Sequence, residues 1–192
     1  MTRTTRCEVS TFAGLFLLAL VMGVFWGTWF TLTRSIETFS ADEFIHIGQT
    51  IITNVAWPMR ILMPAYILFM VLSAALFPEK NSAGFYLSIA ACLLIIVALL
   101  ITLLVEVPID NQIRTWTAQT APADWISIRE RWQVFHTART FVSLASLSSL
   151  ILAVLSLRSQ KLVYPERHYE GSAACCCLGY FGIPNLTRAN VR

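Results

Sequence analysis

Five side chains able to bind or react recur along one stretch of the chain, at positions that a helix would place on a single face. They are Trp125, Arg129, Trp132, His136 and Arg139, separated by four, three, four and three residues. For Trp125, Arg129 and the neighbouring Arg131, a location at the membrane interface explains the residue types as well as a functional role does. Tryptophan and arginine are common at such interfaces. For His136, Arg139 and the earlier Glu106 a functional role is favoured, since ionisable groups close to hydrocarbon are costly and are usually paired inward.

A second polar face precedes this one in the chain. Glu106, Asp110 and Arg114 follow one another at intervals of four residues, so one helical face would carry two carboxylates and a guanidinium. We assign this face to structural ion pairing, and the specific pair that we predict is Arg139 with Glu106. Pro108 lies within the segment and predicts a kink, because proline cannot donate a hydrogen bond to the residue four positions back.

Four apolar runs must position these residues. They cover 12–32, 61–77, 84–105 and 141–157 in a chain of 192 residues that is 56% hydrophobic and only 13% charged. A helix of about 20 apolar residues crosses the hydrocarbon core of a bilayer. The second run is marginal by this measure, which predicts that residues before Arg60 extend it. The first run is kept as a mature helix, because a cleaved signal peptide has a shorter apolar core of about 7 to 15 residues.

The polar segments between the runs are also helical in pattern. The stretch from Phe44 to Asn54 is amphipathic and is opened by Ser40 with Glu43 three residues later, the spacing of a capping box. We therefore expect a helix lying at the outer surface here, and a further helix starting at Asp124 after the break at 121–123. The predicted fold is an all-α bundle of four transmembrane helices with helical extensions and an amphipathic helix on the outer side.

Charge indicates how this bundle sits in the membrane. The N-terminus, the second loop and the tail carry eight lysines and arginines against four acids, whereas the first and third loops carry six against seven. The positive-inside rule then predicts that both termini are cytoplasmic and that the first and third loops face outward, in a bacterial inner membrane. We expect a cytoplasmic N-terminus over 1–10, a membrane domain over 11–158 and a poorly ordered cytoplasmic tail over 159–192.

Several classes of protein are excluded by what the sequence lacks. None of the three histidines, His46, His136 and His168, falls in the core of a span, so a haem bundle is not expected, and no cysteine falls in an outward loop to form a disulfide. The run Cys175 to Cys177 lacks the usual spacing of a metal site, and S-acylation is the alternative.

A net charge of +3 with no nucleic-acid motif excludes nucleic acid as a partner. The expected partners are the lipid bilayer, a small aromatic or lipid ligand and, as a homo-oligomer, further copies of the chain.

Some of these segments resemble a known family. The stretch from Gly23 to Trp29 with Ser35 and 44–54, the stretch from Glu106 to Asn111, and Arg131 and Trp132 followed by 136–140 are similar to the anthrone oxygenase-like family of small four-helix membrane proteins. The resemblance covers about residues 11–158. It implies a four-helix membrane bundle and, as in the named members of the family, oxidation of an anthrone to an anthraquinone without a metal or other cofactor.

The resemblance also suggests roles for individual residues. His136 would be the base that removes a proton from the anthrone CH2 group, since imidazole is a suitable base near neutral pH. Asn111 would hydrogen-bond the developing oxyanion, and Arg139 would stabilise the enolate or hold Glu106. Substrate contacts are expected from Trp116, Trp125, Arg129 and Trp132, the tryptophans acting as aromatic walls. The alternative is a non-enzymatic scaffold, in which these side chains would be packed or paired rather than lining a cavity.

Overall fold

The computed structural model describes residues 3–163, with side chains from 5 to 157, and all of its regular elements are helical. The α-helices are α1 (Arg3–Thr28), α2 (Ala41–Leu76), α3 (Ala83–Ile101), α4 (Val107–Ile113) and α5 (Trp125–Val163). Two π-helical turns, η1 (Trp29–Thr33) and η3 (Thr102–Glu106), follow α1 and α3, and a 3-10 turn, η2 (Ile36–Thr38), precedes α2. The expectations for His168 and for the Cys175 to Cys177 run fall outside the described residues, and so does most of the expected poorly ordered tail over 159–192, of which the structure describes only 159–163, as the end of α5.

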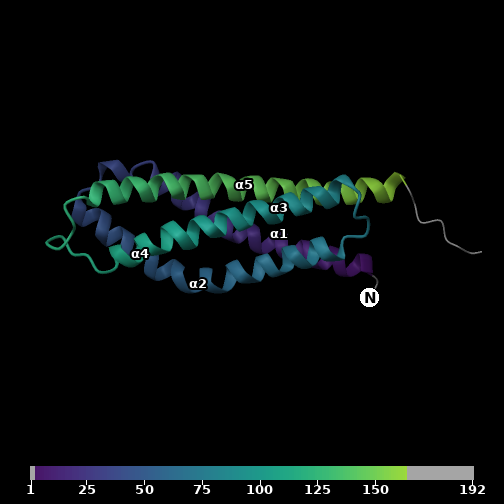
Figure 1. The fold of residues 1–192 in the computed structure, drawn as a ribbon, viewed down its shortest axis with the longest axis horizontal. Coiled ribbons are helices and arrows are strands. Elements are labelled where there is room, and N and C mark those ends of the chain that lie inside the picture. Colours follow the sequence, from purple (N-terminus) through teal and green to yellow (C-terminus); the bar gives the residue numbers. More distant parts are fainter. Residues whose placement is uncertain (1–2, 164–192) are drawn as a thin grey trace, which may run out of the picture.

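Four stretches of the described chain are long and apolar enough to cross a membrane: Thr5–Thr33, Ala41–Leu76, Ala83–Ile113 and Trp125–Leu157. The predicted four-helix membrane bundle is therefore confirmed, and the protein is an integral membrane protein. The helices run side by side, with the connections 34–40 and 114–124 at one end and the N-terminus and the connection 77–82 at the other (Figure 1). We call the end that carries 34–40 and 114–124 the loop end.

The second span differs from its expected form in one respect. The amphipathic segment from Phe44 to Asn54 is helical, but it is the first part of the 36-residue helix α2 and not a separate helix at the surface. The predicted capping box is present, because the Ser40 hydroxyl accepts from the backbone N–H of Glu43 while the Glu43 carboxylate accepts from the backbone N–H of Ser40. Nothing interrupts the helix between this cap and the apolar run, so the two segments fold as one.

Small side chains bring α3 and α5 close together. Thr140, Ser143, Ser146, Leu150 and Ala153 of α5 are buried at steps of three and four residues, and the Ser146 hydroxyl donates to the carbonyl of Ala91 in α3 over 2.8 Å. Serine and alanine permit such close approach within a bilayer. The serine-rich fourth run therefore packs inside the bundle, as the sequence predicts.

The distortion expected near Pro108 takes the form of the π-turn η3. The backbone N–H of Val107 donates to the carbonyl of Thr102, five residues back, and Pro108 has no N–H to continue the ladder. The helix then resumes as α4 and carries the span on to Ile113. Both Thr102 and Glu106, the two ends of the π-turn, are buried.

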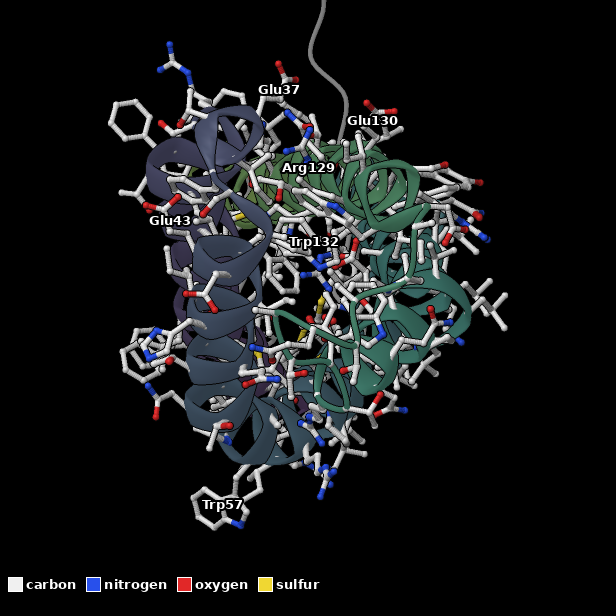
Figure 2. The ribbon with its side chains drawn as sticks, turned by 90° about the vertical axis from the view of Figure 1, so that its left-hand side faces the viewer. Glu37, Glu43, Trp57, Arg129, Glu130 and Trp132 are labelled. Atoms are coloured by element: carbon white, nitrogen blue, oxygen red, sulfur yellow. The ribbon has the colours of Figure 1, made fainter. Side chains whose placement is uncertain are left out.

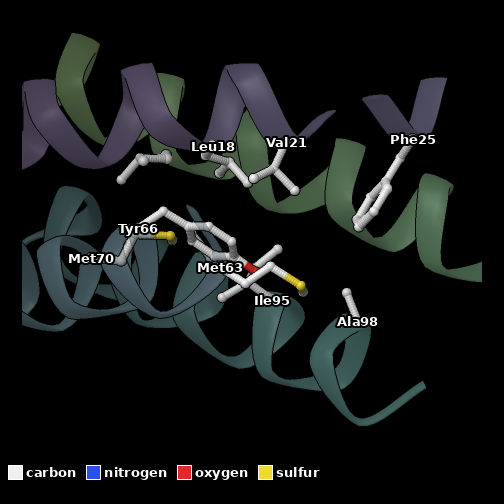
Figure 3. Packing of buried hydrophobic residues seen from close by; sticks show 10 residues of the cluster. Leu18, Val21, Phe25, Met63, Tyr66, Met70, Ile95 and Ala98 are labelled. Carbon is white, nitrogen blue, oxygen red and sulfur yellow. The ribbon is translucent and has the colours of Figure 1, made fainter. Parts of the chain in front are cut away.

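Two buried clusters hold the bundle together. The inner cluster joins Leu18, Val21 and Phe25 of α1 to Met63, Tyr66 and Met70 of α2 and Ile95 and Ala98 of α3 (Figure 3). The outer cluster lies toward the loop end and consists of Ile36, Phe44, Ile45, Ile52, Ile109, Ile113, Trp116 and Trp132. The polar residues of interest lie where these two clusters meet.

Candidate functional site

The predicted ion pair between α5 and the end of the third span is present. The Arg139 guanidinium Nη2 lies 3.1 Å from Oε2 of Glu106, and the Glu106 side chain is 0% exposed. A carboxylate removed from water in this way needs a cationic partner. Arg139 therefore compensates a buried charge that the fold would otherwise have to carry alone.

His136 completes this cluster, and both of its ring nitrogens have partners. Nδ1 lies 2.8 Å from Nη2 of Arg139, and Nε2 lies 3.3 Å from the backbone carbonyl oxygen of Phe25 in α1. Because the guanidinium is a donor only and the carbonyl an acceptor only, the contacts assign a neutral imidazole with its proton on Nε2. The ring also stacks on Trp132 at a centroid separation of 4.8 Å and an interplanar angle of 9°.

Arg139 has further contacts on two neighbouring elements. Its Nη1 lies 3.4 Å from the hydroxyl oxygen of Thr102, and its guanidinium carbon lies 4.6 Å from the centre of the Phe25 ring, within the range of a cation–π contact. The π-turn places Thr102 and Glu106 within reach of the same guanidinium. Single π-turns of this kind are frequent at functional sites.

A cavity of about 780 Å³ adjoins this cluster. This volume is in the range of pockets that bind small molecules. All four spans line the cavity, with mostly apolar side chains from α2, from α3 and from the end of α1. Its polar lining consists of Thr28, Arg60, Thr102, Asp110, Asn111, Arg114, His136 and Arg139, next to the indole ring of Trp132.

Asp110 is the carboxylate that lines this cavity. It is partly exposed, and Trp132 lines the cavity with it. Asn111 and Arg114 of the same helical segment line the cavity too. The three residues of the second predicted polar face thus separate: Glu106 contacts Arg139, whereas Asp110 and Arg114 line the cavity.

The structure brings together only part of the predicted site. His136, Asn111, Arg139 and Trp132 line the cavity, as the enzymatic interpretation requires. Trp116, Trp125 and Arg129 are not among its lining residues. The Arg129 side chain donates to the carbonyl of Ile36 over 3.4 Å and lies over the Trp125 ring at 5.3 Å, while Trp116 is 9% exposed in the outer cluster.

Figure 2 looks onto the loop end of the bundle. Trp132 and Arg129 lie toward the middle of the helices, whereas Glu37, Glu130 and Trp57 project outward. Two side chains tie this end together across the chain. Gln49 donates to the carbonyls of Ile113 and Trp116 over 3.0 and 2.9 Å, and Gln133 donates to the carbonyl of Thr33 over 3.1 Å.

Sequence reasoning missed three contributors to the site. Phe25 supplies a backbone carbonyl and a ring face, and a backbone acceptor leaves no signal in the sequence. Thr102 is hidden in an apolar run. Arg60 could have been found from the sequence, because it is a cation between apolar segments. The sequence analysis placed it in the first outer loop, but it lies within α2 and lines the cavity. Among the described residues, no group of three or more His, Cys, Asp or Glu side chains is placed to hold a metal ion.

Comparison with known protein families gives a match over part of the chain. A family model described as anthrone oxygenase matches residues 55–149. The matched stretch runs from the middle of α2 into α5 and contains every residue of the Glu106, Arg139 and His136 cluster, together with Asp110, Asn111 and Trp132. No curated protein and no solved structure matches the chain.

Proposed function

Because this chain belongs to the anthrone oxygenase-like family, we propose that its cavity binds a flat aromatic ketone and that the protein oxidises this ligand with dioxygen, without a cofactor. One observation carries the proposal: a cavity of about 780 Å³ joins a long apolar wall to a cluster of proton acceptors and cations. A three-ring ketone needs both parts, since its rings are apolar and its reaction passes through an anion. The indole face of Trp132 at the polar end suits a flat ring system.

The reaction balances with dioxygen as the only oxidant. A base removes one proton from the CH2 group that the conjugated ketone acidifies, which leaves an electron-rich enolate. The enolate carbon forms a C–O bond to dioxygen and gives a peroxide, which loses the second hydrogen of that carbon as a proton while the O–O bond breaks. The carbon is oxidised by four electrons and dioxygen takes up all four, one oxygen atom staying as the new carbonyl and the other leaving as water.

Asp110 is the residue that we assign as the base. It is the carboxylate that lines the cavity, and a carboxylate has lone pairs on both oxygens that can take up a proton. Asn111, Arg60 and Arg114 line the same cavity. Donors and cations placed in this way stabilise an anion that develops during the reaction.

His136, the base expected from the sequence, is kept as the alternative. Its Nδ1 already accepts from Arg139 and its Nε2 proton is donated to the carbonyl of Phe25. It would take up a proton only after the Arg139 guanidinium moved away from Nδ1. We therefore propose that His136 and Arg139 shape and polarise the wall of the cavity, while Asp110 exchanges the proton.

The ligand is proposed to arrive from the bilayer. Leu68 and Val71 of α2 and Leu103 and Val107 of the third span line the cavity and are also exposed on the outside of the bundle, by between 38% and 56%. Apolar residues exposed between two spans face lipid tails, in which a polycyclic aromatic dissolves well. The access route would then pass between α2 and α3.

Orientation and organisation complete the proposal. We propose that the loop end faces outward and that both termini are cytoplasmic, because the positive-inside rule follows the arginine and lysine bias of the loops. The polar end of the cavity would then lie at the outer side of a bacterial inner membrane. The membrane domain proposed over 11–158 contains the whole site.

A scaffold function is supported by one observation of its own. Glu106, Arg139 and His136 are paired with one another, which is what a purely structural cluster requires. The cavity beside them supports the enzyme instead. The two proposals differ in whether an occupant of that cavity is chemically changed.

The test is turnover of an anthrone by purified protein in lipid vesicles. Asp110→Asn should lower the rate about 10²–10⁴-fold, the usual contribution of a general base, while the protein keeps its thermal unfolding temperature. Asp124→Asn is the matched control, since Asp124 is an exposed acid of the loop end that does not line the cavity. If Asp110→Asn keeps full turnover and His136→Gln loses it, His136 and not Asp110 is the general base. No turnover by the wild type or any variant would favour the scaffold.

A further inference from the structure

A second, smaller cavity lies beside the first, toward the loop end. Its volume is about 30 Å³, and it is lined by residues of η1, of η2 and the connection that follows it, of the first part of α2, of α4 and by Trp132 of α5. Apart from Asp110 and Gly48, every side chain that lines it is aliphatic or aromatic. The proposed reaction on the aromatic ligand makes no use of this space.

The two cavities share part of their walls. Ile51, Ile52, Asp110 and Trp132 line both of them. The small cavity therefore lies directly behind the carboxylate and the indole that we place beside the reacting carbon. A small molecule held there would be next to the proposed enolate.

The volume and the apolar lining of the small cavity determine which molecules it can hold. About 10–15 Å³ is enough for one water-sized molecule, so the space is sufficient, but a buried water needs two to four polar partners. Among the lining residues, at most two polar groups border this space, the Asp110 carboxylate and the Trp132 indole N–H, and the remaining side chains are apolar. Empty cavities lined by aliphatic and aromatic side chains stay dry and take up apolar gases such as xenon.

We propose that this small apolar cavity is a dioxygen site that supplies the larger one. The inference rests on the proposed oxygenase function and adds the place of its second substrate. Dioxygen is small and apolar and needs no hydrogen bonds. It would concentrate in such a space, react with the enolate across the shared wall and end as the carbonyl oxygen and water already described.

Gly48 offers a way to fill this space with one methyl group. A Cβ atom added at Gly48 would lie 3.3 Å from Cγ2 of Ile113, so it would occupy the cavity or push Ile113 slightly into it. Ile47→Phe provides a second, larger filling from the preceding residue, which also lines only the small cavity. Gly23→Ala is the matched control, because a Cβ atom at this helical glycine meets nothing within 4 Å.

The test has one arm that needs turnover and one that does not. Crystals of the wild type under xenon pressure should show xenon between Gly48, Phe44 and Ile113, and crystals of Gly48→Ala and Ile47→Phe should not. In turnover assays both filled variants should raise the KM for dioxygen severalfold while the dissociation constant of the aromatic ligand stays unchanged, and Gly23→Ala should behave as the wild type.

The outcomes separate this inference from the function on which it rests. Turnover with no xenon in the wild-type cavity, or with the same dioxygen dependence in both filled variants, would overturn the dioxygen site and leave the oxygenase standing. Xenon binding without any turnover would show a gas-binding cavity while removing the oxygenase function, and the proposed role would fall with it.

Discussion

Arg139 contacts groups from three parts of the bundle: the Glu106 carboxylate and the Thr102 hydroxyl of η3, the Phe25 ring of α1, and the His136 imidazole on its own helix. A guanidinium suits this position because it donates in several directions within one plane. Its interaction with His136 leaves that imidazole neutral and occupied. At the scale of single residues, Arg139 joins the elements that form the wall of the cavity, and Asp110 faces the cavity in which we propose that the ligand binds.

Removal of Arg139 should therefore destabilise the protein. In Arg139→Ala the fully buried Glu106 loses its cationic partner, and breaking a buried pair costs about 3–5 kcal/mol. The free energy of unfolding in detergent micelles measures this. Arg131→Ala, an exposed arginine of the same helix, should change stability by less than about 0.5 kcal/mol.

A double-variant cycle provides the decisive comparison for this pair. Glu106→Gln combined with Arg139→Gln removes both charges, so the double variant should lose less stability than the sum of the single losses. Additive losses would mean that the two side chains do not interact, contrary to their 3.1 Å separation.

At the scale of the elements, the site depends on how the spans pair. α3 and α5 are drawn together through small side chains such as Ala91 and Ser146, and α2 lies along α1 through residues such as Tyr66 and Leu18. The cavity lies among these helices, and its apolar wall is exposed where α2 and the third span border the lipid. The π-turn before Pro108 adds the local change of register that turns Glu106 inward and leaves Asp110 on the cavity side.

Access from the bilayer can be tested at that exposed wall. Leu103→Trp places a bulky ring at the proposed access route, so a fluorescent anthraquinone dissolved in vesicles should associate severalfold more slowly in stopped-flow measurements. Leu93→Trp is the matched control, because Leu93 is an exposed leucine of the same span that does not line the cavity. Equal association rates in the two variants would exclude this route.

How much of this could be predicted from the sequence differs between fold and site. The four spans follow from apolar runs, and the Glu106 to Arg139 pair follows from the cost of ionisable groups near hydrocarbon. The sequence did not show that α2 continues unbroken from Ser40. A search for apolar runs finds only the later part of this helix, because its first part is amphipathic. The carbonyl of Phe25 and the cavity itself depend on how distant helices approach one another, which no local pattern records.

At the scale of the whole molecule, the two polar connections lie at one end of the bundle and the connection 77–82 at the other. Apart from Arg60, which lies near the middle of α2, the polar residues of the cavity lie toward the loop end of the bundle. With the charge bias of the loops, this arrangement predicts that the loop end is the outer one.

Cysteine labelling of intact cells tests this orientation. In a background without native cysteines, Gln119→Cys at the loop end should react with a membrane-impermeant maleimide, whereas Asn81→Cys should react only after permeabilisation. Both positions are exposed in the structure. The reverse pattern would place the polar end of the cavity at the cytoplasmic side, and labelling of both from outside would contradict the four-span arrangement.

The proposed function is the oxidation of an aromatic ketone in the cavity by dioxygen. The most direct measurement supplies an anthrone and ¹⁸O₂ to purified wild-type protein in lipid vesicles and follows oxygen uptake and product mass together. We predict one dioxygen consumed for each anthraquinone formed, with one ¹⁸O atom in the new carbonyl, at a rate well above that of protein-free vesicles and of Asp110→Asn. Oxidation no faster than in protein-free vesicles, or a new carbonyl without ¹⁸O, would contradict the account.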